Sequence, residues 1–184
     1  MTSILKVDNI QNSSGTAAMT IDGSSNVTFP QNATFSGTVN GAGKILQVVQ
    51  GILSHANGMS TTSTSYVDTG LQVLITPSSS SNKILISSSF TLYNAGGHNM
   101  KITATRNHSG ISETDLSTNT NGGFSQLHTT GAIGSGGAIS FLDSPSTTNE
   151  ITYKIRAKVS GGTGYFSIGG DSLIQVLEVA QWVV

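Results

Sequence analysis

Alternation of apolar and polar residues limits this chain to β-structure. Residues 67–75 carry Val, Thr, Leu, Val and Ile at every second position, and residues 151–159 repeat the pattern with Lys and Arg between the apolar side chains. A period of two indicates a strand with one face toward a core. No segment keeps an apolar 3.6-residue period through two helical turns. We therefore predict an all-β fold.

Turn residues divide the chain into about eight such strands, which is typical of a β-sandwich or jelly roll. The predicted strands cover residues 46–50, 67–75, 84–92, 100–104, 139–141, 151–159, 165–168 and a last strand from residue 172. The polar, glycine-rich stretch 107–137 predicts long loops with one or two short strands.

The last predicted strand is apolar on both faces. Leu173, Leu177 and Val179 share one face, while Ile174 and Val176 lie on the other. A strand apolar on both faces is buried on both. In a two-sheet sandwich the second face needs a cover, and a subunit interface would supply it.

Residues 1–45 differ from the rest, so we predict two parts: an N-terminal stalk (1–45) and a C-terminal β-sandwich (46–184). The first part holds short apolar segments separated by turn residues, too short to bury a core within one chain. We expect it to pack against copies of itself as an extended, trimeric β stalk. The residues predicted to face the three-fold axis are Val27, Phe29, Phe35 and Val39.

Composition excludes several functions. Charged residues are 9% of the chain, against roughly 25% in a typical domain, and the net charge is -1. This predicts no nucleic-acid binding, which needs a basic surface. There are no cysteines, so disulfides and thiolate metal sites are excluded. No apolar run is long enough for membrane insertion, and the first residues do not form a secretory signal.

Three phrases resemble bacteriophage fibre proteins. The opening ILKVDNIQNSSG is similar to segments that anchor such fibres to the virion, and NVTFPQNATFSGTVNG is similar to their shaft repeats. The stretch YVDTGLQVLITPSSSSNKILI, with the closing SLIQVLEVA, resembles trimeric jelly-roll heads similar to the tumour-necrosis-factor and C1q folds. The resemblance implies a homotrimer on a virion, assembled in the host cytoplasm. The residues implied to anchor it are Ile4, Leu5, Val7 and Ile10.

Candidates for chemistry are few. Gly41-Ala42-Gly43-Lys44 lacks the upstream glycine and the following Ser or Thr of a phosphate loop. The carboxylates that a glycosidase-like pair would need are Asp68, Glu113 and Asp115. None of the histidines forms a helical i, i+4 pair, although three copies of His98 or His128 near a three-fold axis would supply a metal site. We predict surface or turn roles for these residues, with no catalysis, no cofactor and no metal.

Loops at the presumed tip of the sandwich are the candidates for recognition. An aromatic ring beside amides suits a sugar, because the ring offers a flat apolar face and the amides bind hydroxyls. The candidate receptor-binding residues are Tyr93, Asn94, His98, Asn99, Phe124, Gln126 and His128. Simple packing of Tyr93 and Phe124 is the alternative.

The leading hypothesis is a non-enzymatic, homotrimeric phage fibre or spike. Its partners would be itself, another virion protein at the N-terminus, and a host-surface receptor, possibly a glycan. A free trimeric lectin or C1q-like adhesin is the second hypothesis, and it would not need the N-terminal anchor. A glycan depolymerase is the third.

Overall fold

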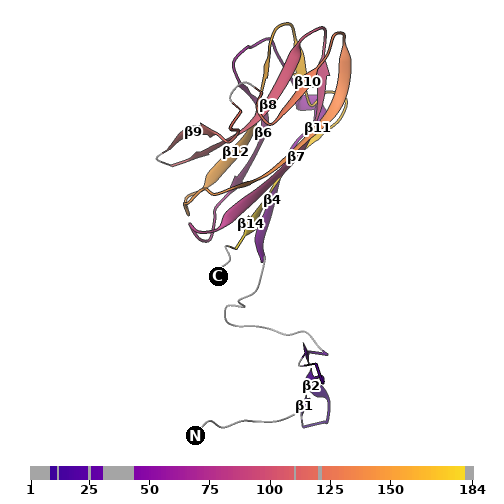
Figure 1. The fold of residues 1–184 in the computed structure, drawn as a ribbon, viewed down its shortest axis with the longest axis vertical. Coiled ribbons are helices and arrows are strands. Elements are labelled where there is room, and N and C mark those ends of the chain that lie inside the picture. Colours follow the sequence, from indigo (N-terminus) through magenta and orange to yellow (C-terminus); the bar gives the residue numbers. More distant parts are fainter. Residues whose placement is uncertain are drawn as a thin grey trace. The chain divides into compact units, whose positions relative to one another are not determined.

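The computed structural model describes residues 9–11, 13–24, 26–30, 44–109, 111–119 and 122–180. The chain divides into two compact units, residues 1–41 and 42–184, which are described separately (Figure 1). Of the described residues, strands hold 60% and helix 2%, which confirms the all-β prediction. Within the described ranges, no helix is long and apolar enough to cross a membrane.

The N-terminal unit contains a three-stranded antiparallel sheet with the order β1 (Asn9–Gln11), β2 (Ala17–Ile21), β3 (Val27–Thr28). Its register pairs Ile10 with Met19 and Ile21 with Val27, so these side chains share one face. None of its described residues is buried, and Ile10, Val27 and Phe29 are 42%, 51% and 44% exposed. The sheet therefore has an apolar face but no core of its own.

Asp22 closes the turn between β2 and β3. Its Oδ1 accepts hydrogen bonds from the backbone N–H groups of Ser24 and Asn26 at 2.8 and 2.9 Å, and its Oδ2 accepts one from the Asn26 amide at 2.8 Å. The bond from the Asn26 side chain, followed by the two backbone bonds, lowers the pKa of Asp22 below its usual value. The turn thus holds its charged side chain in local hydrogen bonds.

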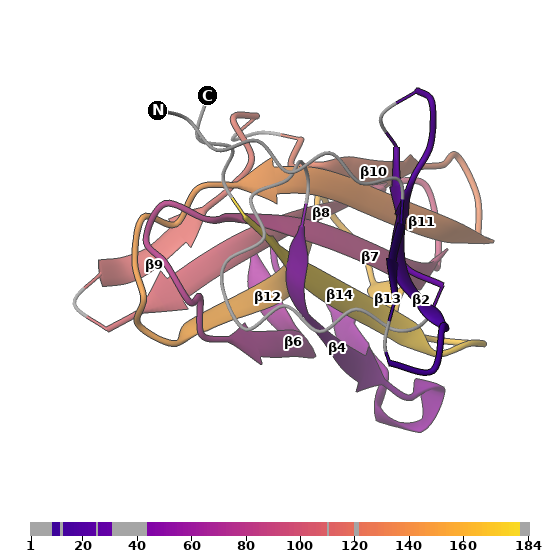
Figure 2. The same cartoon turned by 90° about the horizontal axis from the view of Figure 1, so that it is seen from below.

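The C-terminal domain is a sandwich of two antiparallel sheets (Figures 1 and 2). Its strands are β4 (Ile45–Leu53), β5 (Met59–Thr61), β6 (Val67–Ile75), β7 (Lys83–Asn94), β8 (Asn99–His108), β9 (Ile111–Asp115), β10 (Ser125–His128), β11 (Ile133–Asp143), β12 (Ile151–Val159), β13 (Gly164–Phe166) and β14 (Ser172–Val179). A short 3₁₀ turn, η1 (His55–Asn57), follows β4.

The strand order is that of a jelly roll. One sheet runs β4–β14–β7–β11, with β13 and β5 continuing beside the end of β7. The other runs β6–β12–β8–β10, with β9 beside the far end of β8. Counting only the eight long or central strands, these sheets read 1-8-3-6 and 2-7-4-5, the arrangement of two interlocked Greek keys.

The core lies between the two sheets. Side chains at every second position of β6, β7, β8, β12 and β14 are almost fully buried there, and Phe90 packs on Phe166 with ring centroids 5.5 Å apart. Gly51 lets β4 approach β6, because a Cβ at this position would lie 2.0 Å from the Gln72 carbonyl oxygen. The alternation in the sequence thus predicted the inward-facing residues of the long strands.

The start of one strand was predicted wrongly. β11 begins at Ile133, earlier than expected, because its glycine-rich half pairs in unbroken register with β7 without needing a side-chain pattern. In the single chain β14 is buried on one face: Ile174 and Val176 are fully buried, whereas Leu173, Leu177 and Val179 are partly covered, so the covering of this second face by a subunit interface stays a prediction.

The two ends of the C-terminal domain differ. The Ala180 N–H donates to the Lys44 carbonyl oxygen at 3.0 Å, so β4 begins beside the end of β14. β14 runs antiparallel to β7 and pairs Val179 with Lys83, which places Asn94 at the opposite end. We call this opposite end the loop end; it is uppermost in Figure 1.

Candidate functional site

The loop end is built by connections that hydrogen-bond to one another. The Ala95 N–H donates to the Thr163 carbonyl oxygen at 3.1 Å, joining the β7–β8 and β12–β13 connections. Asn99 and Ser160 form a reciprocal pair, in which the Asn99 N–H donates to Ser160 Oγ at 3.0 Å and the Ser160 N–H donates to the Asn99 carbonyl oxygen at 2.9 Å. These contacts give the loop end a defined shape.

Three predicted receptor-binding residues come together on one face. Asn99 on β8 lies directly opposite His128 on β10, and Gln126 lies opposite Lys101. Gln126 and His128 are exposed, and Asn99 is partly exposed. The register therefore places an amide pair, an imidazole and an ammonium group on the outer face of the β6–β12–β8–β10 sheet. We call these four residues the amide patch.

Tyr93 lies on the other side of the sandwich. It points outward from β7 and is 37% exposed, with its ring 5.6 Å from that of Tyr165 on β13 and tilted by 57°. Tyr165 is absent from the sequence-based candidates, and its place in the aromatic strand GYF was the signal that could have found it. The single predicted site is thus two separate groups on opposite sheets.

The other three candidates are turned inward or packed. Asn94 is fully buried, and its side-chain amide donates to the His98 carbonyl oxygen and so closes the β7–β8 loop. The His98 ring packs against Gly162, where an added Cβ would lie only 1.9 Å from the ring atoms. Phe124 stacks on Phe141 at 4.4 Å and contacts the core. Their receptor role stays a prediction, with little surface to support it.

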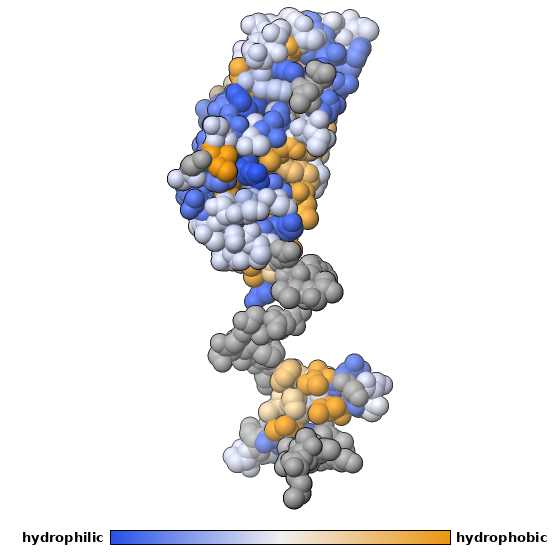
Figure 3. Space-filling model, turned by 60° about the vertical axis from the view of Figure 1, so that its left-hand side comes forward, coloured by the Kyte–Doolittle hydropathy of each residue, from blue (hydrophilic) through white to orange (hydrophobic). Residues whose placement is uncertain are grey.

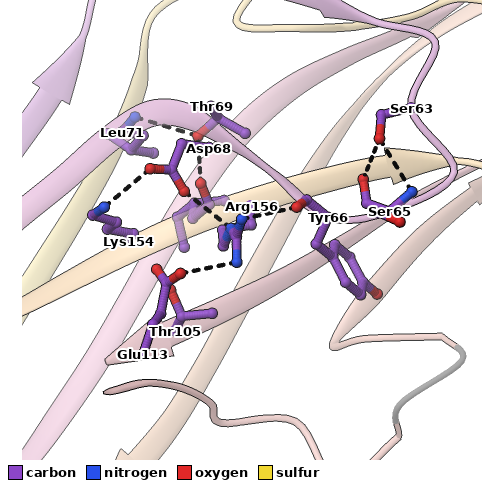
Figure 4. Close-up of polar contacts among 11 residues, drawn as sticks. Ser63, Ser65, Tyr66, Asp68, Thr69, Leu71, Thr105, Glu113, Lys154 and Arg156 are labelled. Atoms are coloured by element: carbon purple, nitrogen blue, oxygen red, sulfur yellow. Dashed lines mark hydrogen bonds and ion pairs between the residues drawn. The ribbon is translucent and has the colours of Figure 1, made fainter. Parts of the chain in front are cut away.

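The carboxylates proposed as an acid pair bind cations instead of each other (Figure 4). Arg156 lies between them, with its Nε 3.0 Å from Asp68 Oδ1 and its Nη1 2.9 Å from Glu113 Oε2. Arg156 Nη2 also donates to the Tyr66 carbonyl oxygen at 2.8 Å, and Lys154 Nζ lies 3.0 Å from Asp68 Oδ2. The arrangement is an ion-pair network across β6, β12 and β9, with both carboxylates engaged.

The network continues toward the loop end. Lys158 Nζ lies 4.4 Å from the centre of the Tyr66 ring, a cation–π contact. Burial, and then the negative charge of Asp115, raises the pKa of Tyr66. Asp115 Oδ1 accepts a hydrogen bond from the Thr103 hydroxyl at 2.6 Å. This outer face therefore carries a cluster of charged side chains, four of which are joined in ion pairs.

A shallow open hollow of about 130 Å³ lies beside this network. Its lining residues are Asp68, Gly70, Leu71, Gln72, Lys154 and Ile155. It sits where the pairing of β12 with β6 shifts register, and where Gly70 adopts a φ of 87°. Its polar groups are those of the ion pairs, so the hollow offers few groups to a ligand.

The predicted anchoring and stalk residues lie in the N-terminal unit. Ile10, Val27 and Phe29 are exposed on or beside its small sheet. The remaining residues of these two sets lie outside the described residues: Ile4, Leu5, Val7, Phe35 and Val39. Among the residues that the structure describes, no three His, Asp or Glu side chains gather as a metal site.

Comparison with known proteins gives no family. No family model matches the chain, and no curated protein matches it. Among solved structures, the chain is similar to a capsid chain of infectious bursal disease virus, Gx strain (TM-score 0.43, 9% identity), covering 85% of this chain and 43% of that chain. It is also similar to Eiger TNF from S. frugiperda (TM-score 0.42, 9% identity), and this match covers 77% of this chain and 97% of that chain.

A third similar structure is the VP2 subviral particle of infectious bursal disease virus (TM-score 0.40, 10% identity, 82% of this chain and 43% of that chain). The chain thus spans less than half the length of these viral chains. The jelly-roll assignment above rests on the strand order of this protein.

Proposed function

We propose that this chain is a non-enzymatic structural protein of a bacteriophage virion. In this proposal it forms a homotrimeric fibre or spike that presents the C-terminal domain for attachment to a host surface. The observation that carries it is the N-terminal sheet, which has an apolar face and no buried residue. The resemblance of its sequence to phage shaft repeats is the reason for proposing a virion as its setting.

The N-terminal sheet needs a partner to be stable. An isolated two-stranded hairpin is marginally stable in water, and a small sheet gains stability by burying a hydrophobic face. Here Ile10, Met19, Ile21 and Val27 share one face, and Phe29 follows on the same side. Copies of the same segment would cover it at equal stoichiometry, and residues 1–8, before β1, would remain to bind another virion protein.

The amide patch is our candidate for receptor contact. Amide and imidazole groups donate and accept hydrogen bonds without a fixed charge, which suits the hydroxyls of a glycan. The patch lies toward the loop end, away from Lys44, where the chain enters the domain. Three weak sites per trimer, repeated over several fibres, would give strong avidity.

Light scattering of the full chain tests the assembly. We expect a mass about three times the 18.9 kDa of one chain, as a closed three-fold oligomer requires. A stable folded monomer would overturn the proposal.

Deletion of residues 1–8, which leaves β1 in place, tests the virion role. The truncated chain should still associate but should no longer enter phage particles. If particles never contain the full-length chain, a free trimeric lectin becomes the better function. Degradation of host polysaccharide by the purified protein would instead support a depolymerase.

A further inference from the structure

The outer face of the β4–β14–β7–β11 sheet carries uncharged side chains in rows across the strands, and one of these rows is apolar throughout. The register aligns Val48, Leu177, Leu85 and Leu142 across the four strands. A second row, two residues along, aligns Gln50, Gln175, Ser87 and Ser140, and a third aligns Ile52, Leu173, Ser89 and Ala138. We call these three rows the neutral face.

The neutral face is uncovered in the single chain. Val48, Ile52 and Leu142 are 57%, 63% and 59% exposed. Single exposed apolar residues are common, but contiguous apolar rows mark interaction surfaces. In the view of Figure 3, hydrophobic side chains form several separate patches on the visible surface of this domain, and much of the rest is hydrophilic.

Charge separates the two outer faces of the sandwich. The three rows contain no charged residue, and Lys83 lies just beyond their end, with its Nζ 2.6 Å from Ser144 Oγ. The opposite outer face carries Asp68, Glu113, Lys154 and Arg156 in one network. Because the chain has so few charges, this distribution suits the charged outer face to contact with water and the neutral face to burial.

The polar groups of the neutral face suit a second copy of the same chain. Symmetry brings a residue near an axis against its own copies, so a fixed charge there would meet like charge. Amides and hydroxyls both donate and accept, and can therefore pair with themselves. Gln175 Nε2 donates to Gln50 Oε1 at 3.0 Å, which leaves the Gln50 amide NH₂ and the Gln175 carbonyl oxygen for an identical pair.

We propose that copies of the C-terminal domain contact one another through the neutral face. This rests on the self-association proposed above but assigns the contact to a particular surface, independent of the N-terminal sheet. The contact would bury Val48, Leu142 and the partly covered outer face of β14, and would leave the ion-pair network and the amide patch open to solvent.

Cysteine labelling of the full chain tests this assignment, because the natural sequence has no cysteine. Val48→Cys and Leu142→Cys probe the neutral face. Leu74→Cys and Ile111→Cys are matched controls, since these positions are 43% and 51% exposed on the other sheet. We expect a maleimide to label the neutral-face cysteines about tenfold or more slowly than the controls, because labelling would require dissociation.

Light scattering of the same samples separates the outcomes. An oligomer with slow labelling at both neutral-face positions supports the proposal. An oligomer with fast labelling overturns it but leaves self-association through the N-terminal unit. A monomer with slow labelling means that another segment of the chain covers the face, and a monomer with fast labelling overturns both proposals.

Discussion

At the scale of single residues, Glu178 shows how the domain tolerates a buried charge. Its carboxylate has no exposed surface, yet it accepts hydrogen bonds from Gln47 Nε2 at 2.6 Å, Asn82 Nδ2 at 2.6 Å, and the Ser78 N–H and hydroxyl at 2.7 and 2.8 Å. Burial alone would raise the pKa of Glu178, but these bonds outweigh it and lower the pKa. The carboxylate therefore ties β14 to β4 and to the β6–β7 turn.

We expect Glu178→Gln to lower the free energy of unfolding by roughly 2–3 kcal/mol at pH 6. The new amide NH₂ would face hydrogen-bond donors, and one or more of these donors would lose its acceptor. The native carboxylate, with its lowered pKa, contributes its full stability above about pH 4.3, and this is lost as the pH falls through the folded-state pKa. Urea unfolding at pH 6 and pH 3 measures both effects. The gap between native protein and variant should shrink at pH 3; an unchanged gap would contradict this account.

Tyr153 provides the corresponding alkaline prediction. Its buried hydroxyl donates to Asp143 Oδ2 at 2.7 Å, and Asp143 also contacts Arg106 Nη1 at 2.7 and 2.8 Å. Burial, and then the charge of Asp143 and the hydrogen bond to it, raises the pKa of Tyr153. The stability from the neutral hydroxyl is present below about pH 10, the unfolded value, and is lost above it.

We expect Tyr153→Phe to cost about 1 kcal/mol at pH 7, because Asp143 keeps its contacts with Arg106. The variant should also lose less stability than the native protein between pH 9 and pH 11, values chosen to bracket an unfolded pKa of about 10. Urea unfolding across this range is the measurement. If both proteins lost the same stability at alkaline pH, the loss would come from tyrosines other than Tyr153.

At the scale of elements, the approach of β4 to β6 depends on one residue without a side chain. A Cβ on Gly51 would lie 2.0 Å from the Gln72 carbonyl oxygen and 3.2 Å from Ile174 Cγ2. We expect Gly51→Ala to cost roughly 1–3 kcal/mol in urea unfolding, because backbone must shift. Gly131→Ala is the matched control, since no atom lies within 4 Å of its Cβ. Equal effects of the two substitutions would contradict the close approach.

The sequence predicted the strands that have one apolar and one polar face. It missed a strand segment that is held only by backbone pairing with its neighbour. β6 and β12 were found because one face is apolar and the other polar, which the sandwich requires. The first half of β11 was missed because Gly134 and Gly136 carry no side-chain signal. The candidate site was predicted as one tip, but residues near in sequence, such as Tyr93 and Asn99, lie on different sheets once the chain turns.

At the scale of the whole molecule, each unit leaves one sheet face uncovered, and each of these faces carries exposed apolar side chains and no charged residue among those named above. The N-terminal sheet exposes Ile10 and Val27, and the C-terminal domain exposes Val48 and Leu142. Among the described residues, the buried hydrophobic core lies in the C-terminal domain and is formed by its strands. The two units should therefore respond differently when they are separated, since one can fold alone and the other depends on association.

A fragment of residues 42–184 tests this difference. We expect it to give the β-sheet circular dichroism of the full chain and to unfold cooperatively, because no core residue is removed. Its association should be weaker than that of the full chain, so its mass by light scattering should fall at lower concentrations as the contribution of the N-terminal apolar face is lost. Full-length Val27→Ser/Phe29→Ser should behave like the fragment, because both side chains are largely exposed in the single chain and their loss reduces the apolar surface to be covered. If the fragment associates as strongly as the full chain, the N-terminal sheet does not contribute to assembly; if it fails to fold, the two units are not independent.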